Sequence, residues 1–486
     1  MSQVVAHDED IVIAGGGIAG LAAARFLVLA GHAPQRITVR EKNPYLGGHA
    51  RTLYLFKDAS GLTRIITAYE IDLGDATHPQ LRPLEPTDAF LAQFPSGSVS
   101  LDDPRILPTD TGFTIFTDRY TNYRRLLSLQ TAHPIFDTSM KSDLRRSYHL
   151  KNDVLLESYL PLFGLWRHPL RFVAQIPSLL QLKRLMRSFL SSVDGLDLDS
   201  MTVDALFRQQ GIHGTLFADL ARALVRLYSG YSSEQTSATS ARYMVDFLRI
   251  SKLETGFDGV TTTLLGNSLT IATLVAELRR EGVTFEMASA WDGARPAEGH
   301  VLFAMHPWQI DALADLDFRS VRVPVYLNTS EWGHLGADAH YRDTAELTHA
   351  TLDIDRYRPD FPDFGVQITF GTSGSDDVYE SKILADARRE GIDRDIVGIA
   401  AYRGEPIQER AIKLEWEHAH VTPDFERSRL AVRSRQGVDR RWYASASLSR
   451  CARHEDGVTS ALETVLLMKG DAARATLEGK GFRAHT

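Results

Sequence analysis

Three consecutive glycines, Gly15–Gly17, interrupt the most hydrophobic stretch of this 486-residue chain and limit what that stretch can become. Residues 10–31, DIVIAGGGIAGLAAARFLVLAG, have the hydropathy of a membrane span, but each central glycine would cost roughly 1 kcal/mol in a continuous helix. The four apolar residues 11–14 are typical of a strand buried in a parallel sheet, and residues 18–30 are good helix formers. We therefore predict a strand, a turn and a helix here, and not a transmembrane segment.

The glycines between the predicted strand and helix have the spacing of the dinucleotide fingerprint G-x-G-x-x-G. Gly15 permits a tight turn, Gly17 lets a pyrophosphate approach the backbone, and Gly20 lets the helix pack closely on the strand. The free N–H groups and the dipole at the start of this helix would attract the phosphates. A second predicted strand, 36–40, ends at Glu41, whose carboxylate can accept hydrogen bonds from an adenosine ribose. This order of features predicts a bound dinucleotide.

The composition is that of a globular protein, with 43% hydrophobic and 24% charged residues. A formal net charge of -8 gives no basic footprint, so we expect no nucleic-acid partner. The single cysteine, Cys451, excludes an intramolecular disulfide and a zinc site built from several cysteines. The N-terminal MSQVVAHDED is polar and acidic and lacks the basic region of a secretory signal. We therefore expect a cytoplasmic protein.

A second glycine loop follows the ribose acid in the sequence NPYLGGHART, where Gly47 and Gly48 precede Arg51 and Thr52. With this pattern the sequence resembles the flavin amine oxidase and phytoene desaturase superfamily. The resemblance implies that the loop runs along the pyrophosphate and ribityl chain of FAD. Rossmann domains that bind only NAD do not usually carry such a loop. The resemblance therefore favours FAD over NAD as the cofactor.

Three further segments resemble one branch of this superfamily, the NAD/FAD-binding amine-oxidase-like proteins often encoded near fatty-acid-modifying enzymes. They are an Asp-Thr-Gly-Phe segment in 109–127, a strand followed by a histidine turn in 301–313, and a His-Glu-Asp-Gly motif with a closing helix in 442–465. The chain departs from the branch because 53–108 separate its glycine loop from Asp-Thr-Gly-Phe. It also has serine, arginine, cysteine and alanine where the branch has glycines before His454.

The resemblance implies an amine-oxidase-like α/β fold, in which a discontinuous Rossmann-like FAD-binding domain carries an inserted substrate domain of mixed sheet and helices. The expected FAD-binding domain comprises residues 1–58, 256–312 and 425–475. The expected substrate domain comprises residues 59–255 and 313–424. Apolar runs predict further strands at 283–287, 301–305, 322–327, 364–370 and 442–446.

In the resembled family, the helix after His-Glu-Asp-Gly directs its N-terminus at the flavin pyrimidine edge. There the helix dipole and the Gly457 N–H would stabilise the negative charge of a reduced flavin. The alternative is that Glu455 and Asp456 only cap the helix, with Asp456 at the N-cap. His454 is the candidate proton relay, and a hydrogen-bonded supporting histidine is the alternative. A covalent flavin link through Cys451 is less favoured than an inert buried thiol.

The full set of expected FAD contacts is Gly15, Gly17, Ile18, Ala19, Gly20, Glu41, Lys42, Gly47, Gly48, His49, Arg51, Thr52, Val283, Glu455, Asp456, Gly457 and Val458.

The segment LEWEHAHV places Trp416, His418 and His420 on one face of a predicted strand. We assign these side chains to a substrate pocket or to packing, because no third metal ligand is evident and we expect no metal. Residues 163–190 mix large apolar side chains with arginine and lysine. Such a basic amphipathic segment could contact an anionic membrane or an acidic acyl carrier protein, or could equally be a core-facing helix with a solvated basic face. His306, after a predicted strand, is expected to be structural.

These observations lead us to expect an FAD-dependent oxidoreductase that oxidises or desaturates an apolar substrate by hydride transfer to flavin N5. A fatty acyl chain, a polyene or a carrier-bound intermediate would fit. The sequence shows no second nucleotide fingerprint, which argues against a flavin reduced by NAD(P)H. The alternatives are a redox-neutral double-bond isomerase, an amine oxidase and a non-catalytic flavoprotein. A homodimer and peripheral membrane contact are left open.

Overall fold

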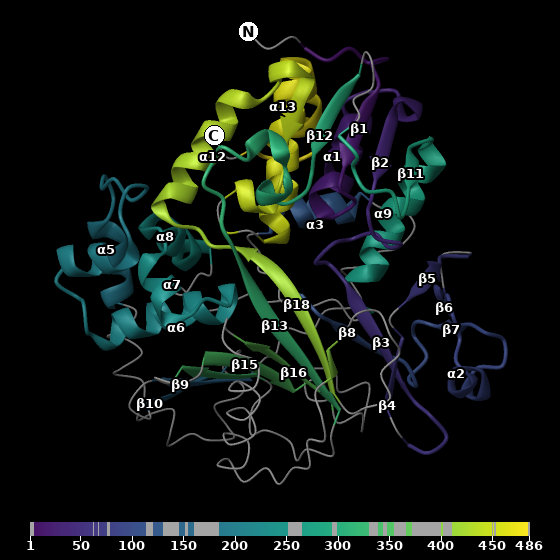
Figure 1. Ribbon diagram of the computed structural model, residues 1–486, viewed down its shortest axis with the longest axis horizontal. Helices are drawn as coiled ribbons and strands as arrows, with labels where there is room; N and C mark the ends of the chain where they lie inside the picture. Colours follow the sequence, from purple (N-terminus) through teal and green to yellow (C-terminus); the bar gives the residue numbers. More distant parts are fainter. Residues whose placement is uncertain are drawn as a thin grey trace.

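The computed structural model describes residues 4–61, 63–66, 68–74, 78–112, 120–129, 145–150, 154–159, 184–250, 265–293, 299–329, 339–343, 348–353, 366–371, 400–401, 411–449, 451 and 453–484. Within these residues the strands form two large sheets and two small three-stranded sheets. Figure 1 shows the first large sheet with its helices in the upper part of the molecule and the second large sheet below it.

The first large sheet has five parallel strands in the order β11-β2-β1-β12-β19. Its strands are β1 (Ile11–Ala14), β2 (Ile37–Arg40), β11 (Thr284–Glu286), β12 (His300–Phe303) and β19 (Arg441–Tyr443). All five strands that the sequence predicts for this sheet are present, within three residues at their ends. They come from three separated segments of the chain, as the expected fold class implies.

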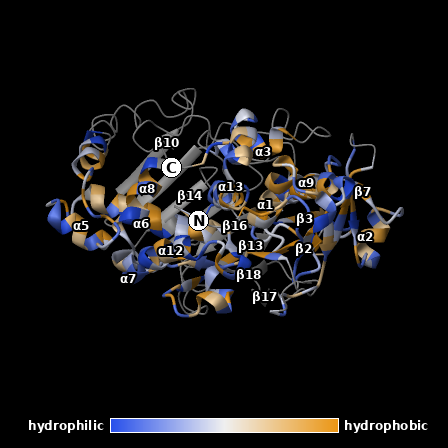
Figure 2. Cartoon of the chain, turned by 90° about the horizontal axis from the view of Figure 1, so that it is seen from above, coloured by the Kyte–Doolittle hydropathy of each residue, from blue (hydrophilic) through white to orange (hydrophobic). Residues whose placement is uncertain are grey.

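Three helices cover this sheet: α1 (Ile18–Leu29), α9 (Asn267–Glu281) and α13 (His454–Gly479). Helix α1 packs against both of the others, and α3 (Thr121–Ser128) packs on α13. Figure 2 shows α1 largely in the colours of hydrophobic residues, and Ala22–Ala24 in it have no exposed surface. The apolar stretch 10–31 is therefore a strand and a buried helix. No helix in the described part of the chain has the length and hydropathy needed to cross a bilayer.

The second large sheet is mixed and has eight strands in the order β10-β9-β14-β15-β16-β13-β18-β17. Its strands are β9 (Arg145–Leu150), β10 (Val154–Tyr159), β13 (Ser320–Thr329), β14 (Ala339–Asp343), β15 (Thr348–Asp353), β16 (Val366–Gly371), β17 (Ala400–Ala401) and β18 (Ala411–Ala419). The long antiparallel pair β13 and β18 reaches up to the first sheet (Figure 1). The two strands that the sequence predicts for this region correspond to β13 and β16.

A group of helices packs beside this sheet: α5 (Val203–Gln209), α6 (Leu216–Ser229), α7 (Ser233–Ala238) and α8 (Ala241–Ile250). Their apolar side chains form one core with Val321, Val323 and Val325 of β13. The polar stretch 229–241 contains the start of α7, where the Ser232 hydroxyl accepts the Gln235 N–H and the Gln235 side-chain oxygen accepts the Ser232 N–H. Helix α12 (Pro423–Arg435) then leads from β18 back to β19.

The described residues of the insertion 53–108 form two small sheets and a helix at the side of the molecule. The insertion separates the second glycine loop from the Asp-Thr-Gly segment in the sequence but not in space. Strands β3 (Thr52–Lys57), β4 (Thr63–Ile66) and β8 (Leu107–Asp110) make one small sheet, and β5 (Tyr69–Asp72), β6 (Gln80–Pro83) and β7 (Val99–Ser100) make the other, with α2 (Asp88–Gln93) beside them. Because β3 pairs with β8, Thr52 lies opposite Asp110. The Asp-Thr-Gly segment therefore returns to the second glycine loop, as the resemblance requires.

Most of the segment 163–190, where we expect a membrane or carrier-protein contact, lies outside the described residues. Its described end is helical from residue 184, and Met186, Phe189 and Leu190 are buried in the core of the helical group. This end therefore follows the core-facing alternative. The domain boundaries given above remain a prediction.

Candidate cofactor and substrate site

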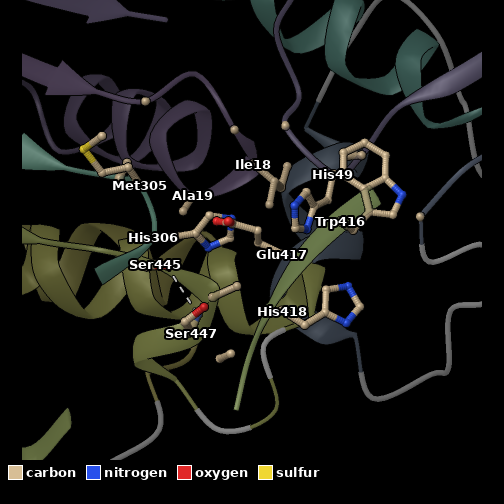
Figure 3. A pocket seen from close by; sticks show the side chains of 18 of the residues that line it. Ile18, Ala19, His49, Met305, His306, Trp416, Glu417, His418, Ser445 and Ser447 are labelled. Carbon is tan, nitrogen blue, oxygen red and sulfur yellow. Dashed lines mark hydrogen bonds between the residues drawn. The ribbon is translucent and has the colours of Figure 1, made fainter. Parts of the chain in front are cut away.

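A cavity of about 660 Å³ lies where the carboxyl ends of β1, β2 and β12 meet the long strands β13 and β18. Figure 3 shows its middle part, around which side chains from α1, the glycine loop, the turn after β12 and β18 gather. The lining on the side of the parallel sheet includes Ala14, Gly15, Gly17, Ile18, Ala19, Arg40, Glu41, Lys42, Asn43, Gly47, Gly48, His49, Ala304 and His306. The lining on the inserted side includes Tyr228, Ser229, Tyr231, Tyr243, Phe247, Val323, Val325, Trp416 and His418.

The fingerprint glycines meet different surroundings. A Cβ on Gly15 would lie 2.6 Å from the Ala304 carbonyl oxygen, and one on Gly20 would lie 2.0 Å from the Gly15 oxygen. At Gly17, by contrast, a Cβ would find only Gly48 Cα, at 4.0 Å, and would project into the cavity. Gly15 and Gly20 are thus required by the fold, whereas Gly17 leaves room for a ligand beside the backbone.

The N-terminus of α1 is open to the cavity. Gly17 is its N-cap, and within the described chain no side chain caps this helix and no acidic residue occupies its first turn. Its first N–H groups and positive dipole end therefore remain available to an anion. The second glycine loop stands against this turn, because the Gly47 N–H donates to the Gly16 oxygen at 2.9 Å. A pyrophosphate fits this cradle.

Glu41 is buried at the end of β2 and is held by main-chain donors. Its Oε2 accepts the Gly16 N–H at 2.8 Å, and its Oε1 accepts the Asn43 N–H at 2.9 Å and the Asn43 Nδ2 at 2.7 Å. A carboxylate has about four acceptor sites, so this one retains capacity for a ribose hydroxyl. Trp291 and Arg40, which we did not single out, extend the lining beyond it, with the guanidinium 5.9 Å from the ring centroid.

Several expected cofactor contacts do not line the cavity. Thr52 instead accepts the Ser268 N–H at 3.0 Å and donates to Asp110 at 2.5 Å, and Asp110 also accepts the Asn267 N–H at 2.8 Å. These bonds fix the start of α9. The Arg51 guanidinium stacks over the Tyr45 ring at 4.0 Å. Thr52, the first residue of β3, thus joins the glycine loop to α9, and Arg51 packs on Tyr45, which lines the cavity.

Val283 also lies outside the cavity lining. Its side chain is 4% exposed and packs in the core beneath α9. Its N–H donates to the Leu278 oxygen at 2.9 Å, because the helix ends at Gly282 and the chain turns sharply into β11. Val283 belongs to an apolar run because its side chain packs in the core. The residues of this segment that line the cavity are Ala290 and Trp291, which follow β11 in the chain.

Helix α13 starts one turn earlier than the sequence predicts, with Arg453 and not Asp456 at its N-cap. Asp456 accepts the Arg453 N–H at 3.1 Å and the Ser449 hydroxyl at 3.3 Å. Gly457 faces α1, where a Cβ would lie 3.1 Å from Ile18 Cγ2, and Val458 is fully buried. These residues set how α13 packs and do not line the cavity.

Glu455 likewise joins two helices. Its carboxylate accepts the Asn122 N–H at 3.0 Å and the Tyr123 N–H at 2.7 Å, so it caps the start of α3. Burial raises the pKa of Glu455 to about 7, although these backbone hydrogen bonds oppose the shift. Glu455 and Asp456 therefore both act as caps, which is compatible with a flavin contact, and that contact stays a prediction.

His454 does line the cavity. Its ring stacks on Tyr123 with centroids 5.6 Å apart, and burial lowers its pKa to about 4. At neutral pH the imidazole is therefore uncharged and could accept a proton but has none to spare as an acid. Cys451 lies nearby in the same lining, and burial raises the pKa of its thiol well above the ordinary value. A protonated buried thiol agrees with the inert interpretation.

His49 lies at the centre of a ring cluster in the cavity, with Trp416, His306 and His418 around it, as Figure 3 shows. The His49 ring centroid is 4.7 Å from Trp416, 5.2 Å from His306 and 5.8 Å from His418. Burial lowers the pKa of all three histidines, to about 4 for His306. No group of metal-binding geometry occurs in the described residues. The three histidines are therefore uncharged at neutral pH, and the Glu417 carboxylate, which accepts the Trp308 Nε1–H at 2.9 Å, lines the cavity beside them.

The strand β18 positions two of its three expected pocket residues. Trp416 donates its Nε1–H to the Thr111 oxygen at 2.9 Å, and His418 Nδ1 lies 3.1 Å from the Ser229 oxygen. His420 follows the end of the strand at Ala419, lies outside the cavity lining and contacts the Gln235 oxygen at 3.0 Å. The alternation of side chains along β18 thus directs Trp416 and His418 into the cavity, and it does not extend to His420, which lies beyond the end of the strand.

A family model and solved structures are consistent with this geometry. Residues 13–94 match the family model described as the NAD(P)-binding Rossmann-like domain. A search of curated proteins found no match. Cyclohexylamine oxidase from Brevibacterium oxydans IH-35A is similar at 16% identity, over 98% of this chain and 100% of that chain, with a TM-score of 0.57. The chain has the amine-oxidase-like flavoprotein fold.

Other structures with the amine-oxidase-like fold differ in what they act on. A CLA-producing fatty acid isomerase from P. acnes is similar at 12% identity, over 95% of this chain and 99% of that chain, with a TM-score of 0.59. Putrescine oxidase bound to putrescine is similar at 12% identity, over 95% and 99% of the two chains, with a TM-score of 0.52. At these identities the likeness concerns the fold, so this chain's own cavity must decide its chemistry.

Sequence reasoning missed the cavity residues of the inserted part of this amine-oxidase-like fold. Tyr228, Tyr243 and Phe247 lie on α6 and α8, where they read as ordinary apolar positions of amphipathic helices. Arg453 reads as a basic residue before a helix, and His306 as a structural histidine after a strand. No local pattern distinguishes these residues, because each reaches the cavity only after the two parts of the fold meet.

Proposed function

We propose that this protein is an FAD-dependent oxidoreductase acting on an apolar substrate. One observation carries the proposal: a single cavity connects the open N-terminus of α1 and the acid at the end of β2 with an aromatic chamber between α6, α8 and β13. A cofactor in the first part would reach a substrate in the second without leaving the protein. This continuity is what transfer between two bound molecules requires.

The residues of the sheet side fit FAD. The N–H groups at the start of α1 would hold the pyrophosphate, and Glu41 would accept the adenosine ribose hydroxyls. Gly48, His49, Ser447 and His454 line the path onward, where the isoalloxazine would be held. When bound, FAD supplies a hydride acceptor.

The chamber explains the choice of an apolar substrate. Tyr228, Tyr243, Phe247, Val323 and Val325 surround it, and hydrogen-bonding groups are few on these walls. Such a surface orients a hydrocarbon by shape and excludes water from the reacting atoms. His454 lies at the edge of the chamber as an uncharged imidazole that could accept a hydrogen bond there, while burial disfavours its protonated form.

Absorbance spectroscopy of the purified protein tests the proposal. We expect bound flavin after expression or after addition of FAD, and lasting bleaching when oleic acid or a related long-chain compound is added without oxygen. Readmission of oxygen or of a quinone should restore the colour. A folded protein that takes up no FAD would contradict the proposal.

A redox-neutral isomerase is the second candidate. It is favoured by the likeness to the fatty acid isomerase fold together with the apolar chamber. In that case the same anaerobic mixture would convert an unsaturated fatty acid to a double-bond isomer over many turnovers, with the flavin oxidised at the end. Mass-neutral product and no net bleaching would select this candidate over the oxidoreductase.

A further inference from the structure

An arginine lines the apolar chamber. Arg453 is the N-cap of α13, and its guanidinium carbon lies 4.7 Å from the ring centroid of Phe247 on α8. Both residues belong to the cavity lining, together with Tyr243 and Cys451. Arg453 thus stands where the helix that enters from the Rossmann-like part meets the helical group of the inserted part.

The charge of this arginine is preserved inside the protein. Burial by itself lowers the pKa of Arg453, but the nearby Asp456 carboxylate favours the charged form and the pKa is raised overall, so the guanidinium stays protonated. The Asp456 carboxylate accepts the main-chain N–H of Arg453 and the Ser449 hydroxyl. The positive end of the α13 dipole adds to the field at the same wall.

We propose that Arg453 binds the carboxylate of the substrate, so that the substrate is an apolar free carboxylic acid. The inference rests on the proposed function and narrows it, because it excludes amines, esters and carrier-bound thioesters. A guanidinium presents two parallel N–H donors that match the two carboxylate oxygens. In a chamber of low dielectric, a fixed cation repels an ammonium group and gains little from an ester.

A binding experiment with three probes tests this inference. Oleic acid, methyl oleate and oleylamine share one hydrocarbon chain and differ in the head group. Each is titrated without oxygen into the protein whose flavin has been reduced with dithionite, and calorimetry then reports binding without turnover. We expect oleic acid to bind at least about thirtyfold more tightly than methyl oleate, with oleylamine weakest.

Variants at Arg453 test whether this residue causes the preference for the free acid over the ester. Arg453→Gln should reduce the acid-to-ester ratio to about one, and Arg453→Lys should retain part of it. Arg249→Gln is the matched control, because Arg249 lies on α8 next to the chamber wall but pairs with Asp194 at 2.6 Å and does not line the cavity. The control should keep the ratio of the unmodified protein.

Each other outcome overturns the inference. The unmodified protein could bind methyl oleate or oleylamine as tightly as oleic acid, a result that stands even where Arg453→Gln fails to fold. Arg453→Gln could instead shift the flavin reduction potential and leave the acid-to-ester ratio unchanged, which would assign Arg453 to the cofactor. A protein without flavin refutes the proposed function separately, and calorimetry with the same three probes then still tests the head-group preference.

Discussion

Gly17 and Gly20 belong to one fingerprint, yet their neighbours assign them different tasks. The space beside Gly17 is part of the cavity, and its φ of -73° is accessible to any residue. The space beside Gly20 is filled by the Gly15 oxygen and by Ala304. A side chain added at Gly17 should therefore weaken ligand binding, whereas one added at Gly20 should destabilise the fold.

The two glycines thus give a matched pair of variants. Gly17→Val should keep the thermal stability of the ligand-free protein near that of the unmodified chain but weaken FAD binding by about tenfold or more, because the side chain occupies the pyrophosphate position. Gly20→Val should lower stability or prevent folding. Thermal unfolding and FAD titration measure both effects. Full FAD affinity in Gly17→Val would show that the cofactor does not approach this turn.

At the scale of elements, the start of α13 ties three helices together. Asp456 fixes its own first turn, Gly457 admits α1, and Glu455 caps α3. Three residues of the His-Glu-Asp-Gly motif thus make packing contacts, and His454 and the preceding Arg453 reach the cavity. A change at Glu455 acts on α13 and α3 together, because the carboxylate belongs to one helix and its donors to the other.

The raised pKa of Glu455 gives this junction a pH dependence. Its folded pKa of about 7 lies above the unfolded value of 4.5, so its contribution to stability is complete below pH 4.5 and is lost as the pH rises through 7. The loss amounts to about 3 kcal/mol at most. Glu455→Gln should make the fall in unfolding free energy between pH 5 and 7 shallower in urea titrations. Glu478→Gln, exposed on the same helix, is the control and should leave the slope unchanged.

At the scale of the whole molecule, the cavity exists because the chain returns repeatedly to one place. The parallel sheet takes strands from near residues 11–40, 284–303 and 441–443, and the pair β13 and β18 carries the inserted part to its edge. Uncharged histidines accumulate where these parts meet, since burial there lowers the pKa of His306 and His454 to about 4. The assembled molecule is consequently sensitive to acid.

For these histidines the change of stability with pH has the opposite sign to that for Glu455. Their folded pKa of about 4 lies below the unfolded value of 6.5, so their contribution is present above pH 6.5 and is lost as the pH falls towards 4. His454→Asn should recover up to about 3 kcal/mol of the stability that the protein loses between pH 6.5 and 4. His213→Asn, at an exposed position, should recover none. Equal acid sensitivity of His454→Asn and the unmodified protein would mean that His454 is protonated in the fold.

The sequence by itself determined the nucleotide-binding half. The strand, the glycine turn, α1 and Glu41 lie within some thirty residues, and glycine spacing, apolar runs and a helix dipole are local properties that a sequence displays directly. Val283 and His420 lie outside the cavity lining, because an apolar or alternating pattern reports burial without saying on which side of an element a cavity lies, and their predicted roles stay predictions.

Only the tertiary structure decided the substrate half. Tyr243, His306, Val325 and Arg453 lie in separate segments of the chain and come from α8, the turn after β12, β13 and the start of α13. Their proximity depends on how the two hydrophobic cores pack against each other. This packing is made of many contacts between residues far apart in the chain, so it leaves no periodic pattern or fixed spacing in the sequence. The charge of Arg453 suggests a substrate head group only once the structure shows that Arg453 lines an apolar chamber.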